Sequence, residues 1–309
     1  MIKKLLLTNF AIIVLIFSGC KAYGQSQIGL YDISNDDKSI LFSFADKSNS
    51  SIFQINTNGT SLKSIVSATP DSIYLNPKYS TNGSKILFIG RPKNTSYNSA
   101  IYIANSDGTK KQRLIANQGI ITEAIFSKCD DKIYYCKANE YGHYSPVGTD
   151  QAHDEDIYSV DLKTKKVNRI TKLKAYGIFY ISEYDCDHLL MNIPVPYQNG
   201  MVKILKGDSM KVDTINPRDH PRSNPDMYST PRYSEKHNTF GFIATYELRI
   251  MNMDDKTSRV VVNHAGMPQI DNFLFLHQKR KLIFTTVSEN TFYIVNFDGA
   301  GLAIIKLPK

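Results

Sequence analysis

Short apolar strands alternate with polar turns from Gln27 to the C-terminus, and this alternation repeats six times. Each copy predicts a turn, an apolar strand, a polar gap, a second strand that usually ends in Asn or Asp, a polar turn and a third strand. In the second copy, which is the clearest, the turn and the three strands are predicted at 79–85, 86–89, 101–105 and 112–115. Asn82-Gly83 supplies the positive φ that a tight hairpin turn requires. Strands joined in this way form a meander.

Two apolar or aromatic anchors, two positions apart, recur in the first predicted strand of every copy, so both side chains leave the same face. The anchor pairs are Ile40/Phe42, Ile86/Phe88, Ile133/Tyr135, Leu189/Met191, Phe240/Phe242 and Leu282/Phe284, spaced by 46, 47, 56, 51 and 42 residues. A strand-only period of roughly 40–50 residues is typical of a β-propeller. We therefore predict an all-β fold, a six-bladed β-propeller of four-stranded antiparallel blades. A β-sandwich is the alternative, although it would not need six in-register copies.

Two stretches of this repeat resemble a known family. Pro77-Lys78-Tyr79-Ser80 through Phe88, followed by Ile101 to Gly108, resembles the TolB-type propeller repeat, also called the WD40-like or PD40 repeat. Pro231-Arg232-Tyr233-Ser234 resembles its start in the fifth copy. The resemblance covers about residues 27–309 and implies a propeller. It implies no single function, because this propeller type serves as an adaptor, a sugar-lyase scaffold and a gating cap in different families.

The N-terminal segment predicts export. Lys3 and Lys4 precede the apolar run 5–17, which is too short for a good membrane span. The segment ends in Ser18-Gly19-Cys20 and resembles a bacterial lipobox, which implies a lipoprotein signal peptide at 1–19, a lipidated Cys20 and a tether at 20–26. The expected location is the outer membrane of a bacterial cell envelope. The alternative is an ordinary secretory signal that is cut after Ala22 or Gly24.

TolB itself is a propeller preceded by a separate α/β domain. Here the first copy begins almost directly after the export segment, so we expect the propeller to occupy 27–309 and that domain to be lacking. The first and last copies each have strands of their own, near 28–33 and 302–305. We therefore predict that the ring closes by packing of the first blade on the last, without an exchanged strand.

The net charge of the chain limits the classes of partner that we expect. The chain has 37 Lys and Arg and 29 Asp and Glu, and without Lys3 and Lys4 the balance is 35 − 29, or +6. These charges are scattered over hairpin tips, so we expect no nucleic-acid partner.

No Cys-x-x-Cys occurs, which argues against a zinc or redox motif. Cys129 and Cys186 lie in corresponding turns of neighbouring copies, so a disulfide between them remains an alternative to two free thiols. We assign no function to Cys136.

The longest gap between the strands of one copy runs from 137 to 155 and contains His143, His153 and Asp154. Long insertions in a regular scaffold often carry function, and imidazoles with carboxylates can bind a divalent cation. His153 and Asp154 are neighbours just before a strand, however, so we expect them to point to opposite faces. We interpret the gap as a loop that contacts a partner, with a metal site or a solvated cover for the blade as alternatives.

A second irregular stretch, 216–225, contains three prolines, which exclude an interior strand. Its Arg218, His220 and Arg222 would suit an anionic ligand at the mouth of the central channel. The stretch faintly resembles the sugar-lyase branch, which uses histidines near the axis with a metal ion. None of those histidines matches a position here, so we assign no catalytic, cofactor or metal residue.

The function expected from these features is binding to an envelope protein by a lipid-anchored module. A sensor or regulatory partner of a transport complex is not separable from this role. The alternative is a polysaccharide-binding or metal-dependent sugar-lyase-like propeller that acts on acidic glycans. No Gly-x-Ser-x-Gly elbow marks a hydrolase, and we do not expect an enzyme.

Overall fold

The computed structural model describes residues 27–46, 48–94, 98–115, 119–143, 150–193, 201–206, 208–219, 228–263 and 267–307, with only the backbone at 27 and 208–210. The proposed signal peptide and Cys20 lie outside this range, as do His220 and Arg222. Within it, no helix is long and apolar enough to cross a membrane.

Six four-stranded antiparallel sheets, each formed by consecutive strands, make up the described chain. The first three blades contain β1 (Gln27–Ile33), β2 (Ser39–Asp46), β3 (Asn49–Asn56) and β4 (Lys63–Val66); β5 (Ser72–Tyr79), β6 (Lys85–Pro92), β7 (Ala100–Asn105) and β8 (Gln112–Ile115); and β9 (Ile120–Phe126), β10 (Lys132–His143), β11 (Asp150–Asp161) and β12 (Val167–Arg169). The last three contain β13 (Phe179–Glu183), β14 (His188–Asn192), β15 (Met201–Leu205) and β16 (Asp208–Thr214); β17 (Tyr228–Ser234), β18 (Thr239–Ala244), β19 (Glu247–Asn252) and β20 (Ser258–Val262); and β21 (Ile270–Phe275), β22 (Lys281–Thr286), β23 (Thr291–Asn296) and β24 (Ala303–Lys306).

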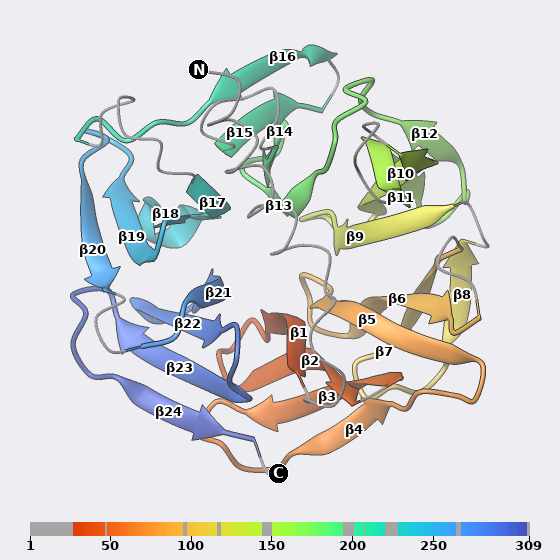
Figure 1. Cartoon of the computed structure of the whole chain (residues 1–309), viewed down its shortest axis with the longest axis horizontal. Helices are drawn as coiled ribbons and strands as arrows, with labels where there is room; N and C mark the ends of the chain where they lie inside the picture. Colours follow the sequence, from red (N-terminus) through yellow and green to blue (C-terminus); the bar gives the residue numbers. More distant parts are fainter. Residues whose placement is uncertain are drawn as a thin grey trace.

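The six sheets stand around one axis, with the first strand of each innermost and the fourth at the rim (Figure 1). The predicted six-bladed propeller is therefore confirmed. All twelve predicted anchors lie in the second strands, and each is at most 1% exposed. Burying them between neighbouring sheets contributes to the hydrophobic stabilisation of the ring.

The first and last blades close the ring by packing, as predicted. Each keeps its own four strands, and among residues 27–307, as far as they are described, no strand passes between them. One apolar cluster joins Tyr31 and Phe42 of the first blade to Ile283 and Phe292 of the last. The Tyr31 hydroxyl also donates to the carbonyl oxygens of Asn272 and Ile283, at 3.0 and 3.2 Å.

Every inner strand pairs with its neighbour through a shift of register, a β-bulge or similar irregularity. In three blades, the residue at this point adopts a left-handed backbone: Asn76, Tyr180 and Thr230 have φ of 52°, 57° and 54°. A bulge bends the strand and re-aims the side chains beside it. The irregularities therefore determine which side chains face the axis.

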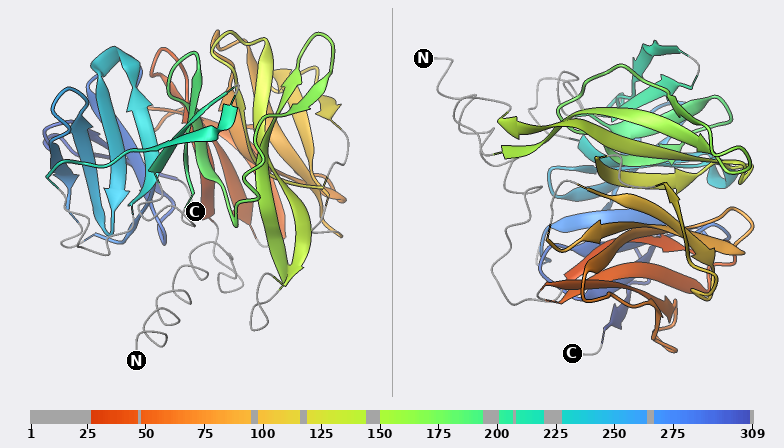
Figure 2. Two further views of the ribbon diagram at one scale, coloured as in Figure 1. Left: turned by 90° about the horizontal axis from the view of Figure 1, so that it is seen from above. Right: turned by 90° about the vertical axis from the view of Figure 1, so that its right-hand side faces the viewer.

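The third blade departs from the prediction of a loop. Residues 137–143 and 150–155 continue β10 and β11 as a paired hairpin, in register from Ala138–Glu155 to His143–Asp150. This hairpin projects beyond the other blades on one side of the ring (Figure 2). Backbone pairing does not depend on apolar side chains, so this polar segment extends the sheet instead of forming a loop.

Candidate functional site

A cavity of about 570 Å³ opens on the axis and is lined by residues from all six blades. It lies where the inner strands end and turn into the second strands, the side of the ring that we call the turn face. β10 runs away from this face, so the hairpin of the third blade projects from the opposite side. The volume lies within the usual range of ligand pockets, about 300–1,000 Å³.

One side chain from each inner strand forms a ring just inside the turns, which we call the axial ring. Each member pairs in register with the residue between the two anchors of its blade. The axial ring consists of Asp32, Lys78, Ile125, Ser182, Arg232 and Leu274, and all six line the cavity. It therefore combines one carboxylate, two cations, one hydroxyl and two aliphatic groups.

Arg232 is only 6% exposed and is held by backbone carbonyls. Its Nη1 donates to the Tyr180 carbonyl at 2.9 Å, and its Nε donates to the Phe273 carbonyl at 3.5 Å. Its guanidinium also lies over the Tyr180 ring, 5.5 Å from the centroid. Burial lowers the pKa of Arg232, while the carboxylate of Glu123 opposes that shift.

Lys78 and Asp32 sit side by side in the axial ring, with Nζ and Oδ1 3.9 Å apart. Lys78 also donates to the carbonyl of Tyr31 at 3.3 Å, and Asp32 accepts the backbone N–H of Tyr79 at 2.9 Å. Burial lowers the pKa of Lys78; Asp32 opposes this shift, and the positive charge of Arg232 adds to it. The second and fifth blades, which carry these two cations, lie across the axis from each other (Figure 1).

A carboxylate below the axial ring links the third and fourth blades. Glu123, on the third blade's inner strand, accepts the backbone N–H groups of Tyr180 and Ile181 at 2.6 and 3.0 Å. Burial raises the pKa of Glu123, and the nearby Arg232 opposes the rise. Glu155, only 3% exposed, accepts the backbone N–H of Ile178 at 2.7 Å, and burial raises its pKa to about 8.

Two ion pairs, each between a lysine and a glutamate, lie at the mouth of the cavity or beside it. Lys128 of the third blade reaches Glu235 of the fifth at 2.7 Å, and Lys206 pairs with Glu183. These cations already have carboxylate partners. The Lys128–Glu235 pair is too exposed to stabilise the fold appreciably.

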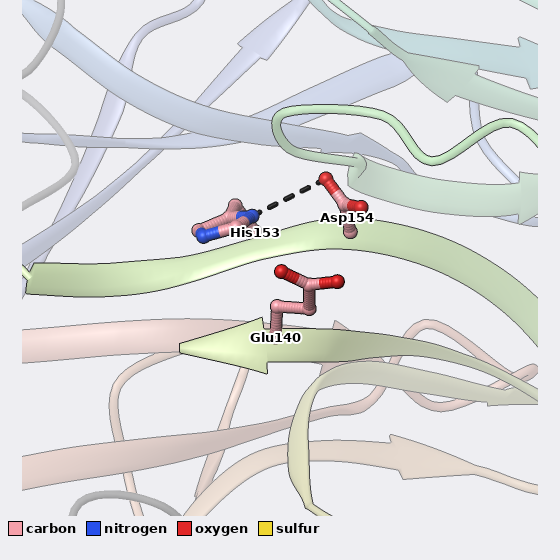
Figure 3. Close-up of side chains that lie close together, drawn as sticks. All are labelled: Glu140, His153 and Asp154. Carbon is pink, nitrogen blue, oxygen red and sulfur yellow. Dashed lines mark hydrogen bonds and ion pairs between the residues drawn. The ribbon is translucent and has the colours of Figure 1, made fainter. Parts of the chain in front are cut away.

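Glu140, His153 and Asp154 lie together on the hairpin of the third blade, with one potential ligand atom from each within 4.8 Å of the others (Figure 3). The expectation that His153 and Asp154 point to opposite faces is wrong, because Nδ1 of His153 lies 3.2 Å from Oδ1 of Asp154. Asp154 has a left-handed backbone, φ 55°, which breaks the alternation of a regular strand. This donor set can hold a divalent cation.

The other two sequence candidates that the structure describes, His143 and Arg218, lie apart from this cluster and do not line the axial cavity. His143 faces Asp150 further out on the hairpin, with Nε2 and Oδ1 3.3 Å apart. Arg218 is exposed at the outer edge of the fifth blade, where its N–H donates to the Lys256 carbonyl, and not at the channel mouth.

The three described cysteines are free thiols. Cys129 and Cys186 are exposed and form no disulfide, and Cys136 is buried. Burial raises the pKa of Cys136 well above its usual value, and the carboxylates of Glu123 and Glu155 add to the rise.

Sequence reasoning missed the axial ring, although a signal was present. Asp32, Lys78 and Arg232 each stand directly before the residue that begins the turn, at one position of the repeat. A charged side chain at a fixed place in an otherwise apolar strand indicates an axial position. The motifs Pro77-Lys78-Tyr79-Ser80 and Pro231-Arg232-Tyr233-Ser234 showed this twice.

No protein-family model and no curated protein matches this sequence. Among solved structures, the chain is similar to TolB from Acinetobacter baumannii, with a TM-score of 0.63 and 14% identity over 98% of this chain and 69% of that one. It is similar to a putative TolB from Agrobacterium tumefaciens, with a TM-score of 0.56 and 15% identity over 77% of this chain and 81% of that one. It is also similar to an oligogalacturonate lyase in complex with manganese, with a TM-score of 0.60 and 9% identity over 89% of this chain and 77% of that one.

At these identities the likeness extends to the fold alone. The order of blades, the buried anchors and the repeat motifs agree with it. The chain is a six-bladed β-propeller whose fold is similar to that of the two TolB structures.

Proposed function

We propose that this protein is a binding module of a bacterial cell envelope, tied to the outer membrane through lipid on Cys20, and that it holds a protein segment in the axial cavity. The observation that carries the proposal is the cavity itself, about 570 Å³ and lined by all six blades. A site built from six separate strand ends combines many different side chains on one rigid scaffold.

Contacts between blades hold this site in shape. The Asp32 carboxylate accepts a backbone N–H from the second blade, and Glu123 accepts two from the fourth. Glu183 accepts the N–H of Lys128 at 2.5 Å in the same way. A preformed site loses little conformational entropy when it binds, which favours affinity.

The charge pattern favours a protein segment over a polyanionic glycan. Four basic residues (Lys78, Lys128, Arg232 and Lys236) and three acidic residues (Asp32, Glu183 and Glu235) line the cavity. A polyuronate needs a row of cations without partners, whereas the rim cation Lys128 is paired with Glu235. Aromatic and aliphatic groups between the charges suit the mixed chemistry of a peptide.

Capture from envelope extracts tests the proposal. The acylated protein, a cavity-filling variant Leu274→Trp and an outer-rim control Val260→Trp would be immobilised and exposed to the same detergent extract. We expect one protein partner to bind the wild type and the control, and to be lost from Leu274→Trp. Recovery of glycans without protein, or equal capture by Leu274→Trp, would contradict the proposal.

A role in acidic-glycan binding or cleavage is the second candidate. Two observations favour it: the similarity in fold to an oligogalacturonate lyase and the cluster of Glu140, His153 and Asp154. Metal analysis of the purified protein separates the candidates. A stoichiometric Mn, Ca or Zn that is lost on His153→Ala and retained on His143→Ala would favour the glycan role.

A further inference from the structure

In the axial ring, the hydrogen-bond acceptors have partners, whereas some of the hydrogen-bond donors have none among the described residues. The acceptors are engaged, because Asp32 takes the N–H of Tyr79 and Glu123 below the ring takes two more. The donors are only partly engaged. Arg232 has five N–H groups and uses Nε and Nη1 in two hydrogen bonds within the described chain, one of them long, at 3.5 Å.

Lys78 and Ser182 add to this excess of donors. The ammonium of Lys78 has three N–H groups, and its contacts are a long hydrogen bond at 3.3 Å and an ion pair at 3.9 Å. Ser182 lines the cavity, and its Oγ, which is buried, has no hydrogen-bond partner in the described part of the chain. A buried hydroxyl without a partner costs free energy, which a ligand acceptor would recover once the side chain rotates toward the cavity.

We propose that the axial cavity binds a carboxylate of a protein segment, either an acidic side chain or a chain terminus, through Lys78 and Arg232 with a further hydrogen bond from Ser182. This inference rests on the proposed function and names the group that is recognised. A carboxylate accepts hydrogen bonds through two oxygens and can take a guanidinium in bidentate fashion. It would also screen the two ring cations from each other.

The rest of the ring decides the kind of molecule that bears the carboxylate. Ile125 and Leu274 are aliphatic members of the ring, and Phe126 and Phe275 line the cavity beside them. A single anionic group attached to an apolar body fits this surface. A chain of uronates fits it less well, because Lys128 is paired with Glu235 and Lys236 donates to the side-chain oxygen of Gln278.

A synthetic heptapeptide library tests the proposal, with half of the peptides carrying a free C-terminal carboxylate and half amidated. Peptides retained by the purified protein would be identified by mass spectrometry. The tightest binder would be measured by fluorescence anisotropy against wild type, Lys78→Met, Arg232→Met and Ser182→Ala. Arg249→Met is the matched control, because Arg249 is a partly buried arginine that pairs with Glu247 on the fifth blade, outside the cavity.

We expect retained peptides to carry a carboxylate, and its replacement by the amide to weaken binding about 10- to 100-fold, the range for hydrogen bonds to charged groups. Lys78→Met should cause a similar loss, Ser182→Ala a smaller one, and Arg249→Met none. Ser182→Ala removes an unpartnered hydroxyl and should fold normally, so it keeps the test valid if Arg232→Met does not fold.

The outcomes separate the two claims. Equal affinity for the carboxylate and amide peptides, or an unchanged affinity in Lys78→Met, would overturn the carboxylate site and leave the protein-binding function standing. Trigalacturonate serves as the parallel probe. Binding of trigalacturonate in a Lys78-dependent manner with no peptide retained would overturn the proposed function, and retention of neither probe would overturn both.

Discussion

The carboxylate of Asp37 in the first blade accepts the backbone N–H of His277 in the last blade, with Oδ1 and N 2.6 Å apart. Its other oxygen accepts the N–H groups of Gln278 and Lys279 at 2.8 and 3.1 Å. Asp37 is 1% exposed and has a left-handed backbone, φ 57°. One buried side chain therefore joins the two ends of a ring that exchanges no strand.

Replacing Asp37 should weaken this closure. We expect Asp37→Gly to lower the free energy of unfolding by about 2–4 kcal/mol, because it removes the charged acceptor of three partly buried N–H hydrogen bonds. Glycine is chosen since it tolerates the positive φ that alanine would not. Urea unfolding measures the change. Asp36→Gly, in the same turn but exposed, is the control and should cost about 1 kcal/mol or less; equal losses would show that Asp37 does not close the ring.

Glu155 should make stability depend on pH. Its pKa is raised from 4.5 to about 8 in the folded protein, so the folded state holds a proton that the unfolded chain releases. The stabilising contribution is complete below the unfolded pKa and is lost as the pH rises through 8, at up to about 1.4 kcal/mol per pH unit. Wild type should therefore lose stability between pH 5 and 8.

Glu155→Gln isolates this effect. The amide keeps an acceptor for the Ile178 N–H and has no proton to lose, so the variant should be about 2–4 kcal/mol more stable than wild type near pH 7.5. The two proteins should converge near pH 5. Chemical denaturation at several pH values checks this, and parallel pH profiles would disprove the assignment. The carboxylate of Glu123, which adds to the raised pKa of Glu155, is present in both proteins.

The thiols should differ sharply in reactivity. Cys129 and Cys186 are exposed, whereas Cys136 is buried and its pKa is raised, so little thiolate forms there. Iodoacetamide should label Cys129 and Cys186 in the folded protein and Cys136 only after denaturation. Peptide mass spectrometry reads out all three sites. Rapid labelling of Cys136 under native conditions would be inconsistent with its buried position.

The anchors of the second strands could be predicted from sequence because burial on one face demands an apolar pattern. Ile40, Phe42 and their counterparts are apolar in every copy, and all are buried. The inner strands were harder to predict, because Asp32, Lys78 and Arg232 interrupt the apolar pattern and the register shifts break its period.

The hairpin of the third blade could not be predicted from the sequence. Asn139, Glu140 and Gly142 have low strand propensity, so the segment resembled a loop. Its strands pair through backbone hydrogen bonds, which side-chain polarity does not reveal. The meeting of His153 with Asp154 depends on one left-handed residue, and no alternation rule could predict it.

Site-specific photo-crosslinking tests the central claim, that the axial cavity is the binding site. A benzophenone side chain would be placed at Gln278, on the exposed mouth of the cavity, or at Val260, on the outer strand of the fifth blade. In envelope extracts, we predict a crosslink to one protein from position 278 and none from position 260. A partner that crosslinks from 260 and not from 278 would contradict the account.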